Sequence, residues 1–332
     1  MLADDVRSNA GMRVIFFGTS SFAVPTLERL VKDGHAIVLC VTRPDRRQGR
    51  GLALEPSPVK AAALRLGVPL DQPERLRADS FAPLHPDVGV TAAFGALLRQ
   101  DVLDVPTHGV FGVHPSLLPA YRGAAPVAWA ILNGETTTGV TIYRLNEALD
   151  AGDVLSRQHA AIEPDEDAEA LTKRLAAIGA KQLVAGLEAL AAGRATFERQ
   201  DDSQATVAPK LTKGQGRIDW QTSAETIVRV IRATAPWPGA TTQWQGSPLK
   251  IWSASVASDR APATTMPGTI IHVSAEGVAV ATGTSTVLIR EIQPAGRRRM
   301  SVKEFIAGHP VHVGEHFGGA GGGRQGAGEK NH

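Results

Sequence analysis

The chain has 332 residues, of which 43% are hydrophobic and 20% are charged, and its formal net charge is +2. This length suits about two domains, and the composition is typical of a soluble globular protein without a strong overall field. No stretch approaches the roughly 18 consecutive apolar residues of a transmembrane helix, and the single cysteine, Cys40, excludes an internal disulfide, argues against a structural zinc site and fits a cytoplasmic protein.

The first element of the fold is expected at Met12. Residues 1–11 contain two acids and no apolar run, so we expect a disordered leader and not a signal peptide. The pattern then predicts strands at 12–17, 36–42, 87–94, 109–114 and 138–145, and helices at 21–34, 57–67, 125–134 and 165–193. Apolar strands that alternate with helices predict an α/β domain over 12–193, with a Rossmann-like, mostly parallel sheet and flanking helices.

The composition changes after this domain. Residues 194–216 are polar and rich in turn-forming residues, which predicts a linker. One helix at 223–234 and five short β-runs follow, and this pattern predicts an OB-like β-barrel over 217–317. Residues 205–312 contain 12 Lys and Arg against 6 Asp and Glu, a net charge of +6, and the glycine-rich tail 318–332 is expected to be disordered.

The stretch FGVHPSLLPAYRG, 111–123, carries the first candidate for chemistry. His114 ends an apolar strand, and sites in open parallel sheets lie beyond the carboxyl ends of the strands. A lone histidine is more often structural than catalytic, but this position favours a catalytic role. Asp150 follows the strand at 138–145, in the turn LDAGD, and such a carboxylate is usually only solvated. Beside His114 it would orient the imidazole and favour its charged form.

Two further stretches have both a structural and a functional interpretation. The turn PSLLPAYRGAAP, 115–126, is either a connection shaped for packing or a preformed wall for a flat, partly apolar ligand. The loop 42–60 carries four arginines within eight residues and is either a solvated surface or a grip for phosphates. The turn FFGTSSF, 16–22, matches neither the dinucleotide nor the P-loop glycine pattern, which disfavours both kinds of nucleotide site.

Several of these stretches resemble one enzyme family. VIFFGTSSFAVPTLERL, TRPDRRQGRG, HPSLLPAYRGAAP, TGVTIYRLNEALDAGDVL and RIDW are similar to segments of methionyl-tRNA formyltransferases, and the resemblance covers about residues 12–312. The HPSLLP and LDxGD blocks are shared by folate-dependent formyltransferases in general. The basic loop, RIDW and the β-barrel are typical of the tRNA enzymes within that group.

The resemblance implies transfer of the formyl group of 10-formyltetrahydrofolate to the α-amino group of methionine on initiator methionyl-tRNA, for translation initiation, without a metal. We expect a monomer, because no long exposed apolar patch is evident in the sequence. His114 and Asp150 fall on the catalytic positions of the family. His114 would donate to the developing oxyanion, and Asp150 would keep the imidazole charged. The implied folate-binding residues are Phe94, Gly95, Ser116, Leu117, Leu118 and Pro119. The implied tRNA-binding residues are Arg43, Arg46, Arg47, Arg50, Arg297, Arg298 and Arg299.

Gly112 departs from the family pattern, which has an asparagine two residues before the histidine. The amide of that asparagine donates to the oxyanion, and loss of one such donor costs about 10²–10³-fold in rate. Either a water molecule fills the space beside Gly112 and donates instead, or the protein is a slow or redirected member of the family. We therefore expect reduced formyl transfer and a higher rate in Gly112→Asn.

Two alternatives belong to other functional classes. One is another 10-formyltetrahydrofolate-dependent formyltransferase or hydrolase that acts on a small substrate, for which a basic second domain would have no use. The other is a tRNA-binding protein that has lost catalysis, against which the presence of both His114 and Asp150 argues.

Overall fold

The computed structural model describes residues 11–48, 53–257, 262 and 264–318, so the expected leader and tail lie outside it except for Gly11 and Gly318. The chain forms two compact units. The N-terminal unit comprises the residues up to Ala130, Glu135–Ile162 and Ala170–Lys210, and the C-terminal unit comprises Ile131–Gly134, Glu163–Glu169 and the residues from Leu211.

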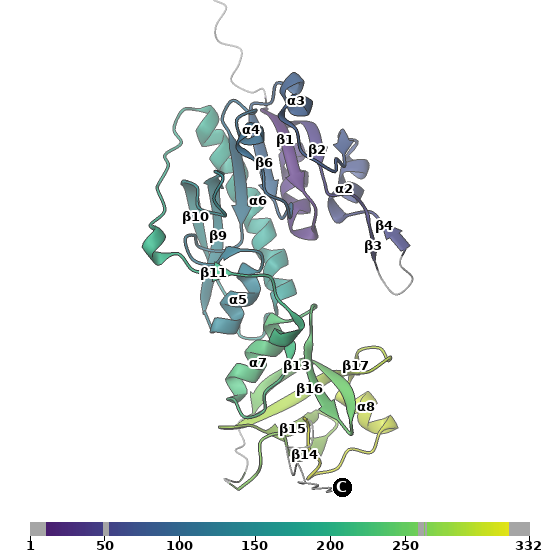
Figure 1. The fold of residues 1–332 in the computed structure, drawn as a ribbon. Coiled ribbons are helices and arrows are strands. Elements are labelled where there is room, and N and C mark those ends of the chain that lie inside the picture. The colour runs from purple at the N-terminus through teal and green to yellow at the C-terminus, as the bar shows by residue number, and fades with distance from the viewer. Residues whose placement is uncertain (1–10, 49–52, 258–261, 263, 319–332) are drawn as a thin grey trace, which may run out of the picture. The chain divides into compact units, whose positions relative to one another are not determined.

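A seven-stranded sheet forms the centre of the N-terminal unit (Figure 1). Its spatial order is β10 (Val154–Ala161), β9 (Thr137–Arg144), β7 (Val110–His114), β6 (Val88–Ala92), β1 (Arg13–Gly18), β2 (Ala36–Val41) and β5 (Leu70–Asp71). The pairs β1–β2, β1–β6, β6–β7 and β2–β5 are parallel, whereas β9 and β10 run antiparallel to their neighbours. The predicted mostly parallel α/β sheet is confirmed. Because β2 and β6 flank β1 on opposite sides, the sheet has a topological switch point between β1 and β6.

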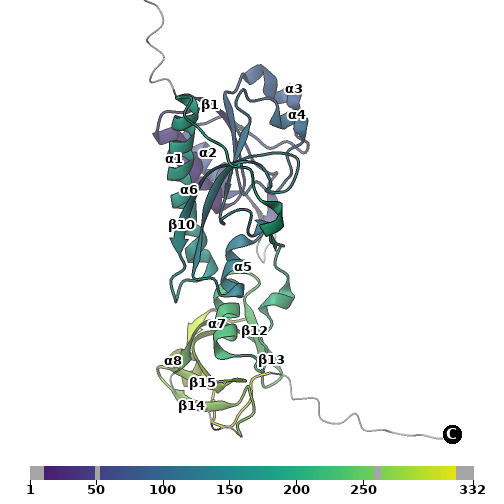
Figure 2. The same ribbon diagram turned by 90° about the vertical axis from the view of Figure 1, so that its left-hand side faces the viewer.

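Helices cover both faces of this sheet (Figure 2). They are η1 (Ser21–Ala23), α1 (Val24–Lys32), α2 (Pro58–Leu66), α3 (Ala78–Phe81), η2 (Ala82–Leu84), α4 (Gln100–Leu103), α5 (Pro126–Asn133) and α6 (Ala168–Ala191). On one face, Phe81 of α3 and Val102 of α4 join a buried cluster with Phe17 of β1. On the other face, α6 approaches β7 so closely that a Cβ on Gly179 would lie 2.6 Å from Cγ1 of Val113.

Local signals account for the helix ends that the sequence patterns located. The Ser57 side chain accepts a hydrogen bond from the backbone N–H of Lys60 and caps α2, and Gly67 ends that helix with φ of 67°. Within β2, Cys40 is fully buried, and burial raises the pKa of its thiol to about 12. Cys40 is thus a small residue of the core.

The segment 194–210 differs from the expected linker because it is part of the N-terminal unit. β11 (Val207–Ala208) pairs in parallel with β8 (Arg122–Gly123), and Glu198 forms an antiparallel bridge with Val154. Backbone hydrogen bonds hold this polar segment in place without an apolar pattern, so composition alone does not distinguish it from a linker. The prediction of a linker is wrong for these residues.

The C-terminal unit is built on a six-stranded antiparallel sheet (Figure 1). Its elements are η4 (Lys213–Gly216), α7 (Ala224–Ala233), β12 (Ala240–Trp244), β13 (Ser247–Ala257), β14 (Ile270–Ser274), β15 (Gly277–Ala281), β16 (Thr286–Pro294), β17 (Met300–Ser301) and α8 (Val302–Gly308). The strand order is β12-β13-β16-β15-β14, with β17 paired to β16. Bridges from Phe317 to Trp244 and from His316 to Thr269 connect the two edges of the sheet, which confirms the predicted C-terminal β-domain.

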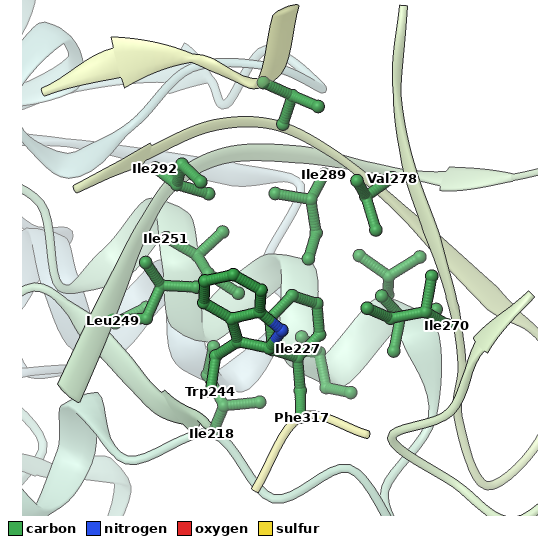
Figure 3. Close-up of a cluster of buried hydrophobic side chains, with 14 of the residues drawn as sticks. Ile218, Ile227, Trp244, Leu249, Ile251, Ile270, Val278, Ile289, Ile292 and Phe317 are labelled. Carbon is green, nitrogen blue, oxygen red and sulfur yellow. The ribbon is translucent and has the colours of Figure 1, made fainter. Parts of the chain in front are cut away.

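Aliphatic and aromatic side chains fill the core of this unit (Figure 3). The ring of Trp220 stacks on Phe317 at 5.8 Å, and Trp244 meets Phe305 edge-on at 5.1 Å. Each fully buried aliphatic side chain contributes about 1.5–3 kcal/mol. Phe317 thus ties the end of the described chain into the same core as the strands.

Candidate active site

His114 is the last residue of β7, and only 6% of its surface is exposed. Its Nε2 lies 2.9 Å from the backbone carbonyl oxygen of Tyr121. A carbonyl oxygen only accepts hydrogen bonds, so Nε2 carries a proton and donates it to Tyr121. The other ring nitrogen, Nδ1, lies 3.7 Å from Oδ2 of Asp150. The structure therefore brings together the two expected catalytic residues and leaves Nδ1 as the ring nitrogen available for chemistry.

Asp150 lies between β9 and β10, and its side chain accepts hydrogen bonds on both oxygens. Oδ1 accepts from the hydroxyl of Tyr143 at 2.7 Å, and Oδ2 accepts from the backbone N–H of Gly123 at 2.7 Å. The backbone of Asp150 has φ of 50°, a left-handed conformation in which Asp is more common than most other residues. These contacts fix the carboxylate with one oxygen toward His114.

Gly112 lies on the same face of β7 as His114, and its register partner on β9 is Tyr143. A Cβ at position 112 would lie 2.4 Å from Cε1 and 2.8 Å from Cζ of Tyr143. An aromatic ring occupies the space of a side chain at position 112, which argues against the alternative in which a water molecule fills this space. The expected gain from Gly112→Asn is also corrected, since an asparagine cannot enter without displacing the ring.

Tyr143 is a buried hydrogen-bond donor beside both catalytic candidates. Burial, followed by the negative charge of Asp150, raises the pKa of its hydroxyl well above 10.0. The hydroxyl therefore stays protonated and donates to Asp150. The ring also meets the imidazole of His114 edge-on, with 6.5 Å between the ring centroids.

A crevice of about 240 Å³ opens at the switch point of the sheet. It is lined by Thr19, Ser20, Arg43, Pro44, Asp45, Glu55, Ser57, Ala93, Phe94 and Gly95, which include the residues that follow β1, β2 and β6. Ligands of open α/β sheets bind at this place. A larger cavity, of about 360 Å³, lies at the start of β7, at the opposite end of that strand from His114, so it is not the candidate site.

Of the six residues expected to bind folate, Phe94 and Gly95 line this crevice. The ring of Phe94 packs edge-on against Phe17 at 5.6 Å, and its carbonyl oxygen accepts a hydrogen bond from Thr19 Oγ1. The lining near Phe94 is therefore held rigidly by the core beneath it.

The other four residues form the turn after His114. The side chains of Ser116 and Leu118 are buried, and the Ser116 hydroxyl donates to the carbonyl oxygen of Ala120 at 2.6 Å. Leu117 and Pro119 are partly exposed. Within this turn, Ser116 and Leu118 hold the backbone, whereas Leu117 and Pro119 remain accessible to a ligand. The folate role of all four stays a prediction.

The seven arginines expected to bind tRNA fall into three groups. Arg43 lines the crevice. Arg46 and Arg47 lie in β3 (Arg46–Gln48), which pairs with β4 (Ala53–Glu55); their side chains, and Arg50 entirely, lie outside the described residues. The last three, Arg297, Arg298 and Arg299, are exposed or largely exposed on the C-terminal unit. The role of these side chains in tRNA binding stays a prediction.

Two residues of the site, Tyr143 and Gln200, were missed by the sequence patterns. The alternation of β9 places Tyr143 and Thr141 on one face, but no local signal shows that this face meets Gly112 and His114. Gln200 donates from Nε2 to the carbonyl oxygens of Asp150 and Gly152, at 2.9 and 2.7 Å, from a segment expected to be a linker. Both contacts depend on residues far apart in the chain.

The described parts of the chain lack two general features. None of their helices has both the length and the apolar character needed to cross a membrane. The same residues contain no group of three His, Cys, Asp or Glu side chains placed to hold a metal ion.

Comparison with known proteins agrees with this geometry. The formyl transferase family model matches residues 12–187, and the model of the formyl transferase C-terminal domain matches residues 210–310. Methionyl-tRNA formyltransferase from Geobacter sulfurreducens is 43% identical over 316 residues, which are 94% of this chain and 98% of that protein. The enzymes of that name from a Roseiflexus species and from Bacillus subtilis are 47% and 42% identical, over 93% and 92% of this chain and 96% and 98% of their own lengths.

Solved structures with low identity share the fold. The N-formyltransferase from Helicobacter canadensis, in complex with folinic acid and dTDP-3-aminofucose, has a TM-score of 0.65 at 14% identity and covers 87% of this chain and 100% of that one. Methionyl-tRNA formyltransferase from Clostridium thermocellum has a TM-score of 0.54 at 16% identity, over 74% of this chain and 94% of that one. The fold and the two family models thus define a formyl transferase. Within that class, the chain belongs to the methionyl-tRNA formyltransferase family.

Proposed function

We propose that this protein transfers the formyl group of 10-formyltetrahydrofolate to the α-amino group of methionine on initiator methionyl-tRNA, in the cytoplasm, for translation initiation. The observation that carries the proposal is the His114–Asp150 pair, with Nδ1 and Oδ2 separated by 3.7 Å, at the end of a strand next to the strand that borders the crevice. The identity of 41–47% to methionyl-tRNA formyltransferases supports the choice of acceptor.

The reaction exchanges one carbon–nitrogen bond for another. The α-amine nitrogen attacks the formyl carbon, a new C–N bond forms, and the carbonyl electron pair moves to oxygen. When the C=O bond forms again, the bond from carbon to the folate nitrogen breaks, and the proton lost by the amine ends on that nitrogen. Negative charge therefore builds up on the formyl oxygen and must be stabilised in the transition state.

His114 is suited to stabilise that oxygen through Nδ1. Because Nε2–H is already bound to the carbonyl oxygen of Tyr121, donation from Nδ1 requires the doubly protonated ring. Asp150 supports this charged ring from 3.7 Å without forming a hydrogen bond of ordinary length to it. The Nδ1 proton is thus free to be shared with an oxygen that enters the site. We propose that the proton lost by the amine travels to the folate nitrogen by way of the Asp150 carboxylate.

The crevice is suited to a folate-type donor. It lies at the switch point of the sheet, it combines the backbone of 93–95 with polar side chains of Thr19, Ser20 and Ser57, and Arg43 offers a positive charge. A formyl donor carries both an aromatic ring system and carboxylates. We assign the ring system to the crevice and Arg43 to a negatively charged group of donor or tRNA.

The positive charge of the C-terminal part of the chain favours an RNA substrate. A net charge of +6 over residues 205–312 favours phosphate binding, and a small-molecule acceptor would have no use for it. We propose that the C-terminal unit binds the tRNA, with the protein acting as a monomer. Size-exclusion chromatography with light scattering tests the oligomeric state.

The central experiment measures formylation of charged initiator tRNA in the presence of 10-formyltetrahydrofolate. We expect formylmethionyl-tRNA to form, and we expect His114→Ala to lower kcat/KM by about 10²–10⁴-fold while donor binding remains. Two further reactions test the rival activities. A reaction with a dTDP-linked amino sugar as acceptor tests formyl transfer to a small substrate, and a reaction without acceptor tests hydrolysis. Transfer to the sugar alone, or formate release with charged tRNA present, would overturn the proposal.

A further inference from the structure

We infer that Gly112 and Tyr143 function as one unit, in which Tyr143 is a positioning residue that holds the Asp150 carboxylate against His114, and in which glycine at position 112 is needed because the tyrosine ring occupies the space of a side chain there. The inference rests on the proposed roles of His114 and Asp150.

The steric part follows from the pairing of β7 with β9. Gly112 and Tyr143 are register partners, so their side-chain directions lie on the same face of the sheet. A Cβ on Gly112 would approach Cε1 and Cζ of Tyr143 to 2.4 and 2.8 Å, distances that real Cβ atoms do not show. It would also lie 2.9 Å from Cδ1 of Leu145, the end of a flexible side chain that can move. The ring of Tyr143 is therefore the obstacle, because the pairing of β7 with β9 and the hydrogen bond to Asp150 hold it in place.

The polar part follows from the hydrogen bond between Tyr143 and Asp150. The hydroxyl reaches Oδ1 at 2.7 Å, and this leaves Oδ2 to the N–H of Gly123 and to the side facing His114. Without Tyr143, the carboxylate keeps one of these two donors and gains freedom of rotation. The edge-on contact of the ring with the imidazole limits the movement of His114 as well.

Tyr143 acts through Asp150 and not on the substrate. Its only hydroxyl proton is donated to Oδ1, and burial keeps the phenol neutral. Tyr143 also does not line the crevice. Its removal should therefore lower kcat and leave donor binding unchanged, whereas a residue that merely supports the fold would change both or neither.

The first test removes the hydroxyl alone. We expect Tyr143→Phe to lower kcat about tenfold, as for loss of one hydrogen bond to a charged group. Its KM for charged tRNA and its affinity for 5-formyltetrahydrofolate, a stable donor analogue, should stay within about twofold of wild type. An unchanged kcat would overturn the positioning role.

The second test measures coupling between the two positions. We expect Gly112→Ala to lower kcat on the order of tenfold or more in the wild-type background, because the methyl group displaces the ring. In the Tyr143→Leu background the same substitution should cost less than about twofold, because Cε1 and Cζ of Tyr143 are gone and the remaining neighbour, Cδ1 of Leu145, can move. Gly112→Asn/Tyr143→Leu should be more active than Gly112→Asn. Equal costs of Gly112→Ala in both backgrounds would overturn the steric part.

The matched control is Gly89→Ala on the neighbouring strand β6. Its Cβ would lie 2.8 Å from Cγ2 of Val110, so it overpacks the same sheet without meeting Tyr143. It should cost the same in both backgrounds. Urea unfolding of the same variants gives the coupling independently of activity. If wild type does not formylate tRNA, the proposed function fails, yet the unfolding data still decide whether Gly112 and Tyr143 are coupled.

Discussion

The side-chain amide of Gln200 ties down the loop that carries Asp150. Its Nε2 donates to the carbonyl oxygens of Asp150 and Gly152, and its Oε1 accepts from the guanidinium of Arg122 at 2.8 Å. Arg122 precedes Gly123, whose N–H binds the Asp150 carboxylate. One buried amide thus connects both loops that position the Asp150 carboxylate.

We predict that Gln200→Glu lowers kcat about tenfold. The change keeps an acceptor for Arg122 but replaces the NH₂ donor by an oxygen that faces two carbonyl oxygens, so the Asp150 loop loses its anchor. Steady-state kinetics on charged tRNA measure the effect. Gln204→Glu, at an exposed position of the same segment, is the control and should behave as wild type. Similar kcat values for the two variants would show that the anchor is not needed.

We predict that Asp150→Asn folds normally but loses about 10²–10⁴-fold in kcat/KM. The amide oxygen can still accept from Gly123, and the amide NH₂ can donate to the hydroxyl oxygen of Tyr143, so both contacts remain, the second with its direction reversed, while the charge is lost. Circular dichroism and thermal unfolding check the fold beside the formylation assay. Activity within a few-fold of wild type would mean that the negative charge beside His114 plays no part in catalysis.

Tyr143 should also make stability depend on alkaline pH. The pKa of its hydroxyl is raised in the folded state, mainly by burial, above the ordinary 10.0. The unfolded chain loses this proton above pH 10 while the folded chain retains it, so this contribution to stability is present below pH 10 and falls as pH rises toward the folded pKa. The free energy of unfolding of wild type should therefore fall relative to Tyr143→Phe, by up to about 1.4 kcal/mol per pH unit. Urea titrations from about pH 9 to 11 measure the difference. Parallel curves would contradict the prediction.

Arg297 and Arg298 should differ in their effect on tRNA binding. Arg298 forms an ion pair with Glu304 at 2.7 Å, whereas among residues 264–318 no acidic side chain lies within ion-pair distance of Arg297. We expect Arg297→Ala to weaken tRNA binding more than Arg298→Ala and to reduce the slope of log Kd against log salt by about one. Filter binding over a range of salt concentrations measures both. Equal effects would show that the ion pair opens freely when tRNA binds.

The sequence alone was sufficient for the fold class and for the two catalytic candidates. Strands such as 36–42 are almost continuously apolar, and this local pattern predicts a covered sheet because burial depends on the residues of each strand. The position of His114 at a strand end then placed it at the functional edge. The short strands β8 and β11 were not predicted, since backbone pairing between two polar loops leaves no mark in either one.

The meaning of Gly112 was decided only by the tertiary structure. By itself, glycine in place of asparagine indicates a lost donor and an empty space. The register of β7 and β9 instead brings Tyr143, 31 positions later in the chain, against that glycine, and brings its hydroxyl to Asp150. Gln200 reaches the same loop from 50 positions away. Strand alternation is a property of neighbouring residues and can be read along the chain, whereas register and loop closure depend on which distant segments meet, and that follows from the packing of the whole unit.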